Sequence, residues 1–244
     1  MNSTTDLLPR AEFERRLLAA IERYPADGTR FYRLLTTGRC PQAMLRRYAL
    51  ATARAAALFC STVATLVDSA PDTEARLVLL ENLLEEEGIF LKADKGLVVR
   101  DEKRHTALAL RFVRACGGDE GDVAALEAAP QPIAPGRRML AEGRWLEGAA
   151  FLLIGQELKF GVTSGQLFEA LKGQGLSARD LAFFAVHIEA DAKHGRQALD
   201  LVLDRAATRV DQEAAIRAAE AGAREWFRMH GGAASERSDK ALAA

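Results

Sequence analysis

The stretch SARDLAFFAVHIEADAKHGRQALDLVL, residues 177–203, places two histidines and an aspartate inside a long run with helical spacing. His187, Asp191 and His194 recur at intervals of four and three residues, so a helix brings all three onto one narrow stripe. The stripe continues along the helix axis into apolar residues such as Val202, which predicts that it faces the interior. A buried aspartate and two buried imidazoles are costly unless they are paired or bound to a metal. The stretch therefore indicates either a structural polar face or half of a metal site.

The rest of the chain repeats the helical pattern. Alanine, leucine, arginine and glutamate dominate, and alternating β-branched runs bounded by turns are almost absent. We expect an all-α bundle of about seven helices, with residues 1–8 a flexible N-terminus, 9–230 a single domain and 231–244 a disordered tail. The helical segments are expected at roughly 9–24, 30–38, 41–69, 73–87, 104–117, 121–129, 137–171, 177–207 and 211–230.

Three local features refine this expectation. Gly88 ends a helix, and residues 89–103 should form a loop or a short extended excursion. Segment 137–171 should be interrupted by Gly-Arg-Trp at 143–145 and by the glycines at 161–165. Ser177 with Asp180 resembles a capping box that opens the histidine-bearing helix.

Composition excludes several classes of function. The net charge of -1 gives no global field for nucleic acid or an anionic membrane. The three cysteines are widely spaced and odd in number, which favours a reducing compartment over a disulfide framework. Residues 1–10 lack the pattern of a signal peptide, and the apolar stretch 49–67 contains an arginine and several polar residues. We expect a cytoplasmic protein that binds a small-molecule substrate and neither nucleic acid nor membrane.

Three ligands on one helix cannot complete a two-metal site, so other helices must supply the rest. In LLENLLEEEG, residues 79–88, Glu86 continues the apolar stripe and is expected to face inward, whereas Glu85 and Glu87 are expected to face water. His105 in KRHTALALRFV has apolar residues on its face; taken alone, such a histidine is more often an interior residue with a structural partner than a metal ligand. Glu157 follows an uncharged apolar stretch, which indicates a buried carboxylate or a glutamate at a helix boundary.

Together these residues resemble the heme-oxygenase-like di-iron oxidases, which share their fold with thiaminase II and pyrroloquinoline-quinone synthase. The specific element is H-x3-D-x2-H on a late helix, joined by a glutamate on the preceding long helix and by E-x-G followed by His-Thr-x-Leu. The opening FYRLLTTGRCPQAMLRRYAL, residues 31–50, is also similar to that superfamily. The resemblance covers roughly residues 10–230.

The resemblance implies two Fe(II) ions held by three histidines and three carboxylates. Carried onto this sequence, the ligands are Glu86, His105, Glu157, His187, Asp191 and His194. It further implies O2-dependent oxidation of a small substrate, such as an amino acid or another small carboxylic acid, by N-oxygenation, C–C cleavage or desaturation. An external electron donor and a homodimer are expected with it.

One departure from the family pattern is the long gap between Glu86 and His105, which contains the excursion at 89–103. The excursion could be a lid or a substrate loop. The gap also leaves Glu81 or Glu85 as alternatives to Glu86.

Two rival functions remain open on the sequence. One is a metal-free member of the same fold, either a thiaminase-like hydrolase or a cofactorless oxidase, with Cys60 or Cys116 as a thiol although both lie in apolar settings. The other is a non-enzymatic helical binding protein. Iron stoichiometry separates the three readings.

Overall fold

The computed structural model describes residues 7–128 and 135–232, apart from the side chains of residues 126–127, 189–192 and 230–232. The expectations for the two termini lie almost wholly outside this range. Within it, the chain is predominantly helical, which confirms the predicted all-α class. The helices are α1 (Arg10–Glu22), α2 (Arg30–Thr36), α3 (Gln42–Asp68), α4 (Thr73–Glu86), α5 (His105–Ala115), α6 (Glu120–Ala128), α7 (Pro135–Ala141), α8 (Trp145–Ala149), α9 (Lys159–Lys172), α10 (Ala182–Arg205) and α11 (Arg209–Gly232). The other elements are the 3₁₀ turns η2 (Ala26–Gly28) and η3 (Asp101–Lys103), the strands β1 (Ile89–Lys92) and β2 (Gly96–Val99), and the π-helical segment η4 (Ala150–Leu158).

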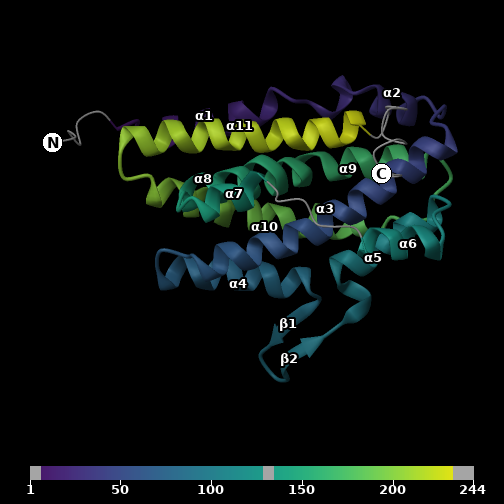
Figure 1. Ribbon diagram of the computed structural model, residues 1–244, viewed down its shortest axis with the longest axis horizontal. Helices are drawn as coiled ribbons and strands as arrows, with labels where there is room; N and C mark the ends of the chain where they lie inside the picture. The colour runs from purple at the N-terminus through teal and green to yellow at the C-terminus, as the bar shows by residue number, and fades with distance from the viewer. Residues whose placement is uncertain (1–6, 129–134, 233–244) are drawn as a thin grey trace.

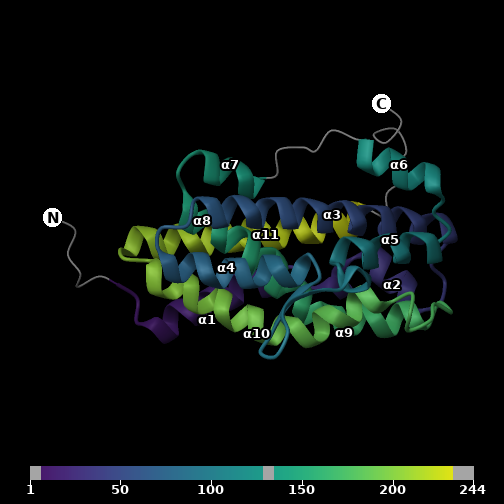
Figure 2. The same cartoon turned by 90° about the horizontal axis from the view of Figure 1, so that it is seen from below.

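The segment η4 lies in the middle of the bundle, where it contacts α1, α10 and α11. Figure 1 shows α1 and α11 side by side along one long edge, with α3 and α4 toward the opposite edge. The short helices α6 and α7 lie outside α3, as Figure 2 shows. Glu157, near the end of η4, is thereby held inside the bundle with 6% of its surface exposed.

Segment 137–171 differs from its prediction. A turn does separate α7 from α8 at Gly143, but the helical run continues from Trp145 to Lys172 through the glycines at 161–165. Glycine in a helix interior costs only about 1 kcal/mol relative to alanine, so packing on both flanks outweighs it. Three of the described helices, α7, α8 and α9, fall in this one predicted segment, which is part of the reason that the described helices outnumber the seven or so expected.

The irregularity in this run is η4 itself, and two glycines bring it close to α11. A Cβ on Gly155 would lie 2.5 Å from the Ala219 carbonyl oxygen and 2.7 Å from the Gly222 Cα. Only glycine at both positions permits such a close approach of two helix backbones. The Gly155–Gly222 contact therefore sets the position of η4 and of Glu157 at its end.

The predicted pair of Ser177 and Asp180 forms, but it lies before α10. The Asp180 carboxylate accepts from the Ser177 hydroxyl at 2.6 Å, and the Asp180 N–H donates to Ser177 Oγ at 3.2 Å. Helix α10 itself begins at Ala182, and its N-cap residue Leu181 makes no side-chain cap, so the expectation that Ser177 opens this helix is wrong: the pair closes the turn that precedes it. Ion pairs on the surface then hold α10 against α1.

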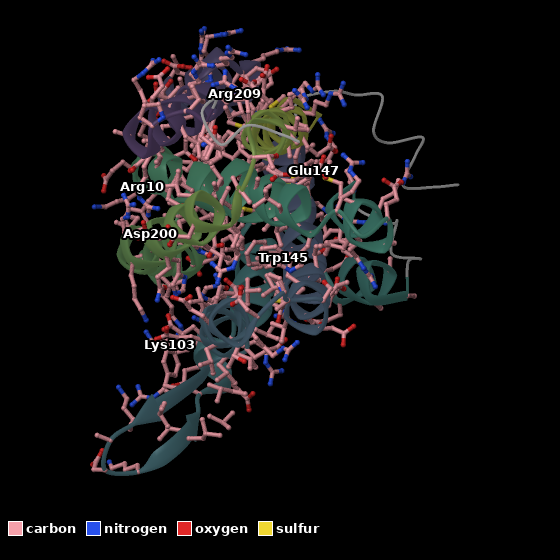
Figure 3. The ribbon with its side chains drawn as sticks, turned by 90° about the vertical axis from the view of Figure 1, so that its left-hand side faces the viewer. Arg10, Lys103, Trp145, Glu147, Asp200 and Arg209 are labelled. Atoms are coloured by element: carbon pink, nitrogen blue, oxygen red, sulfur yellow. The ribbon has the colours of Figure 1, made fainter. Side chains whose placement is uncertain are left out.

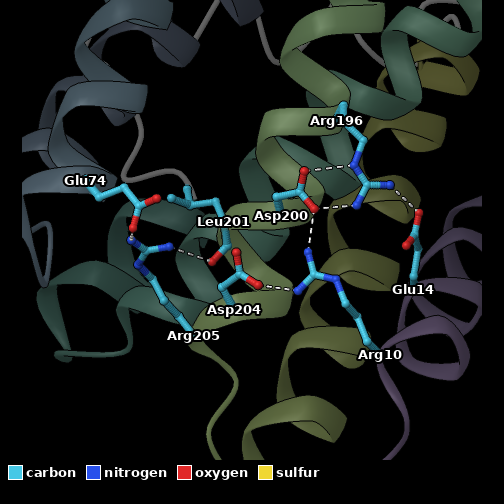
Figure 4. A network of polar contacts seen from close by, with 8 residues as sticks. All are labelled: Arg10, Glu14, Glu74, Arg196, Asp200, Leu201, Asp204 and Arg205. Carbon is cyan, nitrogen blue, oxygen red and sulfur yellow. Dashed lines mark hydrogen bonds and ion pairs between the residues drawn. The ribbon is translucent and has the colours of Figure 1, made fainter.

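In that surface network, Arg10 pairs with both Asp200 and Asp204, and Arg196 pairs with Asp200 (Figure 4). Arg196 also donates to Glu14 on α1 at 2.7 Å. The side chains are partly exposed, so each pair contributes little to stability by itself. As a network they fix the register between α1 and the helix that carries the two histidines of interest.

Two apolar clusters make up the core. The first includes Leu17, Leu66, Leu79, Ile154 and Val202. The second includes Phe31, Tyr48, Leu108, Phe112 and Phe184. The first residues of α10 belong to the second cluster and its later residues belong to the first. His187 and His194 lie between these two parts of the helix. The candidate site therefore occupies the polar boundary between two apolar regions.

The excursion at 89–103 is an antiparallel hairpin followed by the turn η3. It pairs Ile89 with Val99 and Leu91 with Leu97. The hairpin projects away from the bundle in Figures 1 and 3, and the label of Lys103 in Figure 3 marks its base. Leu91 and Leu97 are 77% and 63% exposed. The hairpin thus exposes apolar side chains at the surface.

Helix α3, among the described helices, is long and apolar enough to cross a membrane by length and composition. A core helix meets the same criterion, and α3 packs against α4 and α5 through buried residues such as Tyr48 and Val63.

Candidate metal centre

Three buried side chains from three helices form the first group of candidate ligands. Glu86 ends α4, His105 opens α5, and His187 lies in the first half of α10. Glu86 Oε1 is 2.8 Å from His105 Nδ1, and one ligand atom of each residue lies within 4.8 Å of the others. Their exposed fractions are 4%, 6% and 8%. Two imidazoles and a carboxylate that converge in this way suit iron, manganese or zinc.

The His187 ring is oriented by its own helix. Its Nδ1 lies 2.6 Å from the Phe183 carbonyl oxygen, so Nδ1 carries the proton and donates to that oxygen. This leaves the Nε2 lone pair free to bind a metal, an arrangement common in metal-ligating histidines. Burial, with a further contribution from His105, lowers the pKa of His187 to about 4. The ring is therefore neutral, as a metal ligand must be.

Glu157 and His194 form the second buried group, beside Asn82. Asn82 Nδ2 donates to Glu157 Oε1 at 2.7 Å, and His194 Nδ1 lies 3.4 Å from the same oxygen. On its other side, His194 Nε2 lies 3.1 Å from Glu85 Oε2. Burial opposes a charge on His194, but the carboxylates of Glu157 and Glu85 outweigh it and raise the pKa of His194 to about 10. The ring is thus protonated without a metal, and a cation that binds to it must displace that proton.

Buried polar atoms in both groups lack a hydrogen bond within the described part of the chain. They include His105 Nδ1, Glu157 Oε2 and His194 Nε2. The two nitrogens lie close to carboxylate oxygens of Glu86 and Glu85, yet without the geometry of a hydrogen bond. A buried polar atom without a partner costs about 1–3 kcal/mol, so these atoms call for a further partner. A divalent cation fits, because imidazole nitrogens and carboxylate oxygens can direct their lone pairs to one point.

Five of the six ligands expected from the sequence are brought into these two groups. The sixth, Asp191, belongs to α10, but its side chain lies outside the described residues. Of the three glutamates considered for the long gap, Glu86 lies beside His105, whereas Glu85 lies beside His194. Glu81 lies at the surface, where Lys193 Nζ donates to it at 2.7 Å.

Glu85 was named from the sequence only as an alternative to Glu86, and its orientation was predicted wrongly. It was expected to face water, but its side chain is only 27% exposed and one oxygen lies beside His194. Its spacing from Glu81 is one helical turn, which places both on the same face of α4. That α10 covers this face depends on how two helices pack, and the pattern of α4 alone does not contain this information.

A cavity of about 400 Å³ adjoins the candidate ligands, and Glu86, Glu157 and His187 form part of its wall. The wall is otherwise mostly apolar and comes from α3, α7, η4, α9, α10 and α11. Its aromatic members are Tyr48, Phe59, Phe151, Phe160, Phe183 and Trp226. A cavity of this size accommodates a small organic molecule. None of its described lining residues comes from the hairpin at 89–103, which the sequence left open as a lid or a substrate loop.

Comparison with known proteins agrees with this architecture. The sequence profile of the family described as "Iron-containing redox enzyme" matches residues 42–227. A domain of unknown function with a heme oxygenase-like fold from Shewanella denitrificans OS217 superposes with a TM-score of 0.66, at 15% identity, over 98% of this chain and 97% of that one. A TenA homolog from Pseudomonas syringae pv. tomato str. DC3000 superposes with a TM-score of 0.72, at 12% identity, over 95% of each chain. A search of curated proteins gave no match.

The two structural neighbours are too distant in sequence to show more than the fold, whereas the family profile covers most of the chain. The expected resemblance is thus confirmed at the level of fold and family. This chain belongs to the family of iron-containing redox enzymes and has the heme-oxygenase-like fold.

Proposed function

We propose that this protein is a cytoplasmic, O2-dependent, non-heme di-iron oxidoreductase that acts on a small organic substrate. The observation that carries the proposal is the convergence of Glu86, His105 and His187 in the interior, beside a second group at Glu157 and His194. Membership of an iron-containing family supports iron over the other metals that this donor set accepts.

In this proposal Glu86, His105 and His187 hold one iron, while Glu157 and His194 hold the other together with Asp191. Two ferrous ions bound in this way supply electrons for the reduction of O2 next to the substrate. The protein contributes by keeping His187 neutral and oriented through its bond to the Phe183 carbonyl oxygen.

The cavity walls have a second role in the proposal. Phe160 and Phe183 pack against the His187 ring, with ring centroids 4.7 and 4.5 Å from it, and exclude water on that side. Arg54 and Glu225 lie elsewhere in the wall and provide charges of both signs. They suit an amino acid or another small carboxylic acid, oxidised by N-oxygenation, C–C cleavage or desaturation. We include an external electron donor and a homodimer in the proposal.

Anaerobic titration with Fe(II) tests the proposal. We expect the wild type to bind about two irons per chain and to consume O2 afterwards. His187→Ala should lose iron at the first group and keep its helical content, because the neighbouring side chains are apolar. Glu87→Gln is the control, since Glu87 directly follows the ligand Glu86 in the chain but is partly exposed and pairs with Arg104. Wild type without iron uptake, or His187→Ala with normal uptake, contradicts the proposal.

The fold shared with a TenA homolog keeps a hydrolase as the rival function. Such an enzyme needs an activated nucleophile, and Cys60 is the thiol that touches the candidate site, with Sγ 3.7 Å from Glu86 Oε2. Burial, and then the carboxylates of Glu86 and Glu87, raise the pKa of Cys60, which disfavours the thiolate. Cys60→Ala should therefore leave iron uptake and O2 consumption intact.

A further inference from the structure

Helix α4 reaches both groups of candidate ligands, and it reaches the second group through an amide. Asn82 Nδ2 donates to Glu157 Oε1 on η4 at 2.7 Å. Glu86 follows Asn82 by four residues on the same face of the helix, and its Oε1 lies 2.8 Å from His105 Nδ1. One face of α4 therefore carries a candidate ligand of the first group and, one turn away, a partner for a ligand of the second.

The hydrogen bond between Asn82 and Glu157 is buried, and chemistry fixes its direction. The two residues are 7% and 6% exposed. A carboxylate can only accept hydrogen bonds, so the amide must turn its NH2 group, and not its oxygen, toward Glu157. A hydrogen bond to a carboxylate is shorter and stronger than one between neutral groups, and it restricts rotation of the carboxylate. Asn82 thus holds one chosen oxygen of Glu157 in place.

The two oxygens of Glu157 have different surroundings. Oε1 accepts from Asn82 and lies 3.4 Å from His194 Nδ1, whereas Oε2 is buried without a hydrogen bond among the described residues. Glu157 forms part of the wall of the large cavity and also of a small cavity of about 10 Å³, which Asn82 and His194 line as well. The small cavity has room for about one water molecule or ion. Oε2 is the oxygen with which Glu157 can bind a cation without giving up the amide.

An uncharged donor suits this position. A lysine or arginine in place of Asn82 would form an ion pair with Glu157 and would place a positive charge beside an incoming cation, whose binding it would oppose. The amide adds no formal charge, so it orients the carboxylate and leaves the negative charge available to a divalent cation.

We propose that Asn82 is a positioning residue of the second metal position, which holds Oε1 of Glu157 so that Oε2 is the oxygen presented to the metal. This inference rests on the proposed function, because it requires Glu157 to be a metal ligand. It adds to the six expected ligands a residue that touches no metal and acts through Glu157. Through Glu86 and Asn82, helix α4 helps to place both metal positions.

Three variants separate positioning from packing. Asn82→Leu keeps a side chain branched at Cγ and removes the donor. Asn82→Ser keeps a hydroxyl donor, which a water molecule in the small cavity can link to Glu157. Val78→Ala is the control, because Val78 lines the same small cavity from α4 but has no hydrogen-bonding group in its side chain. Circular dichroism and thermal unfolding establish that each variant is folded.

The measurement is an anaerobic calorimetric titration with Mn(II) alone. In Asn82→Leu we expect the first binding event to remain and the second to weaken about 10- to 100-fold. Asn82→Ser should lie between the wild type and Asn82→Leu. Val78→Ala should unfold at a lower temperature, because it loses buried methyl groups, and should keep both binding events.

Electron paramagnetic resonance at two equivalents of Mn(II) per chain gives a second readout. The six-line signal of free Mn(II) should be weak in the wild type and in Val78→Ala, and strong in Asn82→Leu. A loss of packing alone would lower the unfolding temperature without releasing the second ion.

The outcomes distinguish this inference from the proposed function. If the wild type binds two ions and Asn82→Leu binds both as tightly, the inference is overturned and the proposed function stands. Equal weakening of the second event in Val78→Ala, or weaker binding in Asn82→Ser than in Asn82→Leu, also overturns it. If Asn82→Leu does not fold, Asn82→Ser carries the test, and an unchanged second event in that variant overturns the inference. If the wild type binds no ion at all, both the inference and the proposed function are overturned.

Discussion

Glu86 Oε1 lies 2.8 Å from His105 Nδ1, although residues 87–104 separate them in the chain. The hairpin between them is a closed excursion, because Arg100 N donates to the Gly88 carbonyl oxygen at 2.7 Å and returns the chain to its starting point. The long gap that departs from the family pattern is therefore compatible with ligation by both residues.

Gly88 is the position on which this closure depends, and Gly88→Ala should damage it. Its φ is +70°, and a Cβ there would lie 2.5 Å from the Arg100 carbonyl oxygen and 2.9 Å from Arg104 N. We expect a loss of about 1–3 kcal/mol in the free energy of unfolding, together with weaker Mn(II) binding at the first group. Urea unfolding and calorimetry measure the two effects. Gly96→Ala is the control, since its φ is +66° but its surroundings are open. Equal effects of the two substitutions would show that crowding at Gly88 is unimportant.

The outer part of the hairpin should be dispensable for metal binding. Replacing residues 91–97 by Asn-Gly keeps the Phe90–Val98 pair and closes a two-residue turn. Since Leu91 and Leu97 are mostly exposed, we expect unchanged Mn(II) affinity and less self-association in light scattering. Loss of metal binding in this variant would mean that the hairpin contributes more than closure.

The glycine contact between η4 and α11 should be intolerant of a methyl group. In Gly222→Ala, the added Cβ would collide with the Phe151 carbonyl oxygen and lie 2.9 Å from the Gly155 Cα. We expect a destabilisation of about 1–3 kcal/mol and weaker binding of the second metal, because η4 carries Glu157. Gly165 lies in α9, which continues η4, and a Cβ there meets nothing within 4 Å. Gly165→Ala should therefore stabilise the protein by about 0.5–1 kcal/mol. Denaturant unfolding of both variants checks the contrast, and a neutral Gly222→Ala contradicts it.

The surface network between α1 and α10 predicts a pH-dependent contribution from Asp200. Hydrogen bonds from Arg196 and, to a smaller extent, Arg10 lower the pKa of Asp200 from 3.8 to about 2. Because the folded-state pKa is depressed, the stabilisation is present above about pH 3.8 and is lost as the pH falls through about 2. Asp200→Asn should cost roughly 0.2–1 kcal/mol per exposed pair at pH 7.

Denaturant midpoints of wild type and Asp200→Asn, followed from neutral to acidic pH, test this expectation. The difference should shrink below about pH 4, and also in about 1 M salt at neutral pH, since salt screens exposed pairs. A difference that stays constant with pH would assign the effect of Asp200 to something other than its charge.

The helices and their inward faces follow from local sequence. Glu86, His105, Glu157 and His187 each continue an apolar stripe of their own segment, and all four are buried. A helix repeats every 3.6 residues, so the direction of a side chain follows from its immediate neighbours in the chain. The contact between Ser177 and Asp180 is local for the same reason.

Contacts between helices could not be obtained in this way. Glu85 lies beside His194 because α10 covers that face of α4, and Gly161 stays helical because packing outweighs its low propensity. The hairpin closure at Gly88 likewise depends on residues that follow it by more than ten positions.

The sequence by itself thus determined the helical class, the family and which polar residues turn inward, since each depends on short-range periodicity and residue type. Only the tertiary structure decided which inward-facing residues meet, namely Glu86 with His105 and His194 with Glu157 and Glu85. The physical reason is that helix pairing is set by the complementarity of whole apolar surfaces, here two clusters that leave a polar boundary between them.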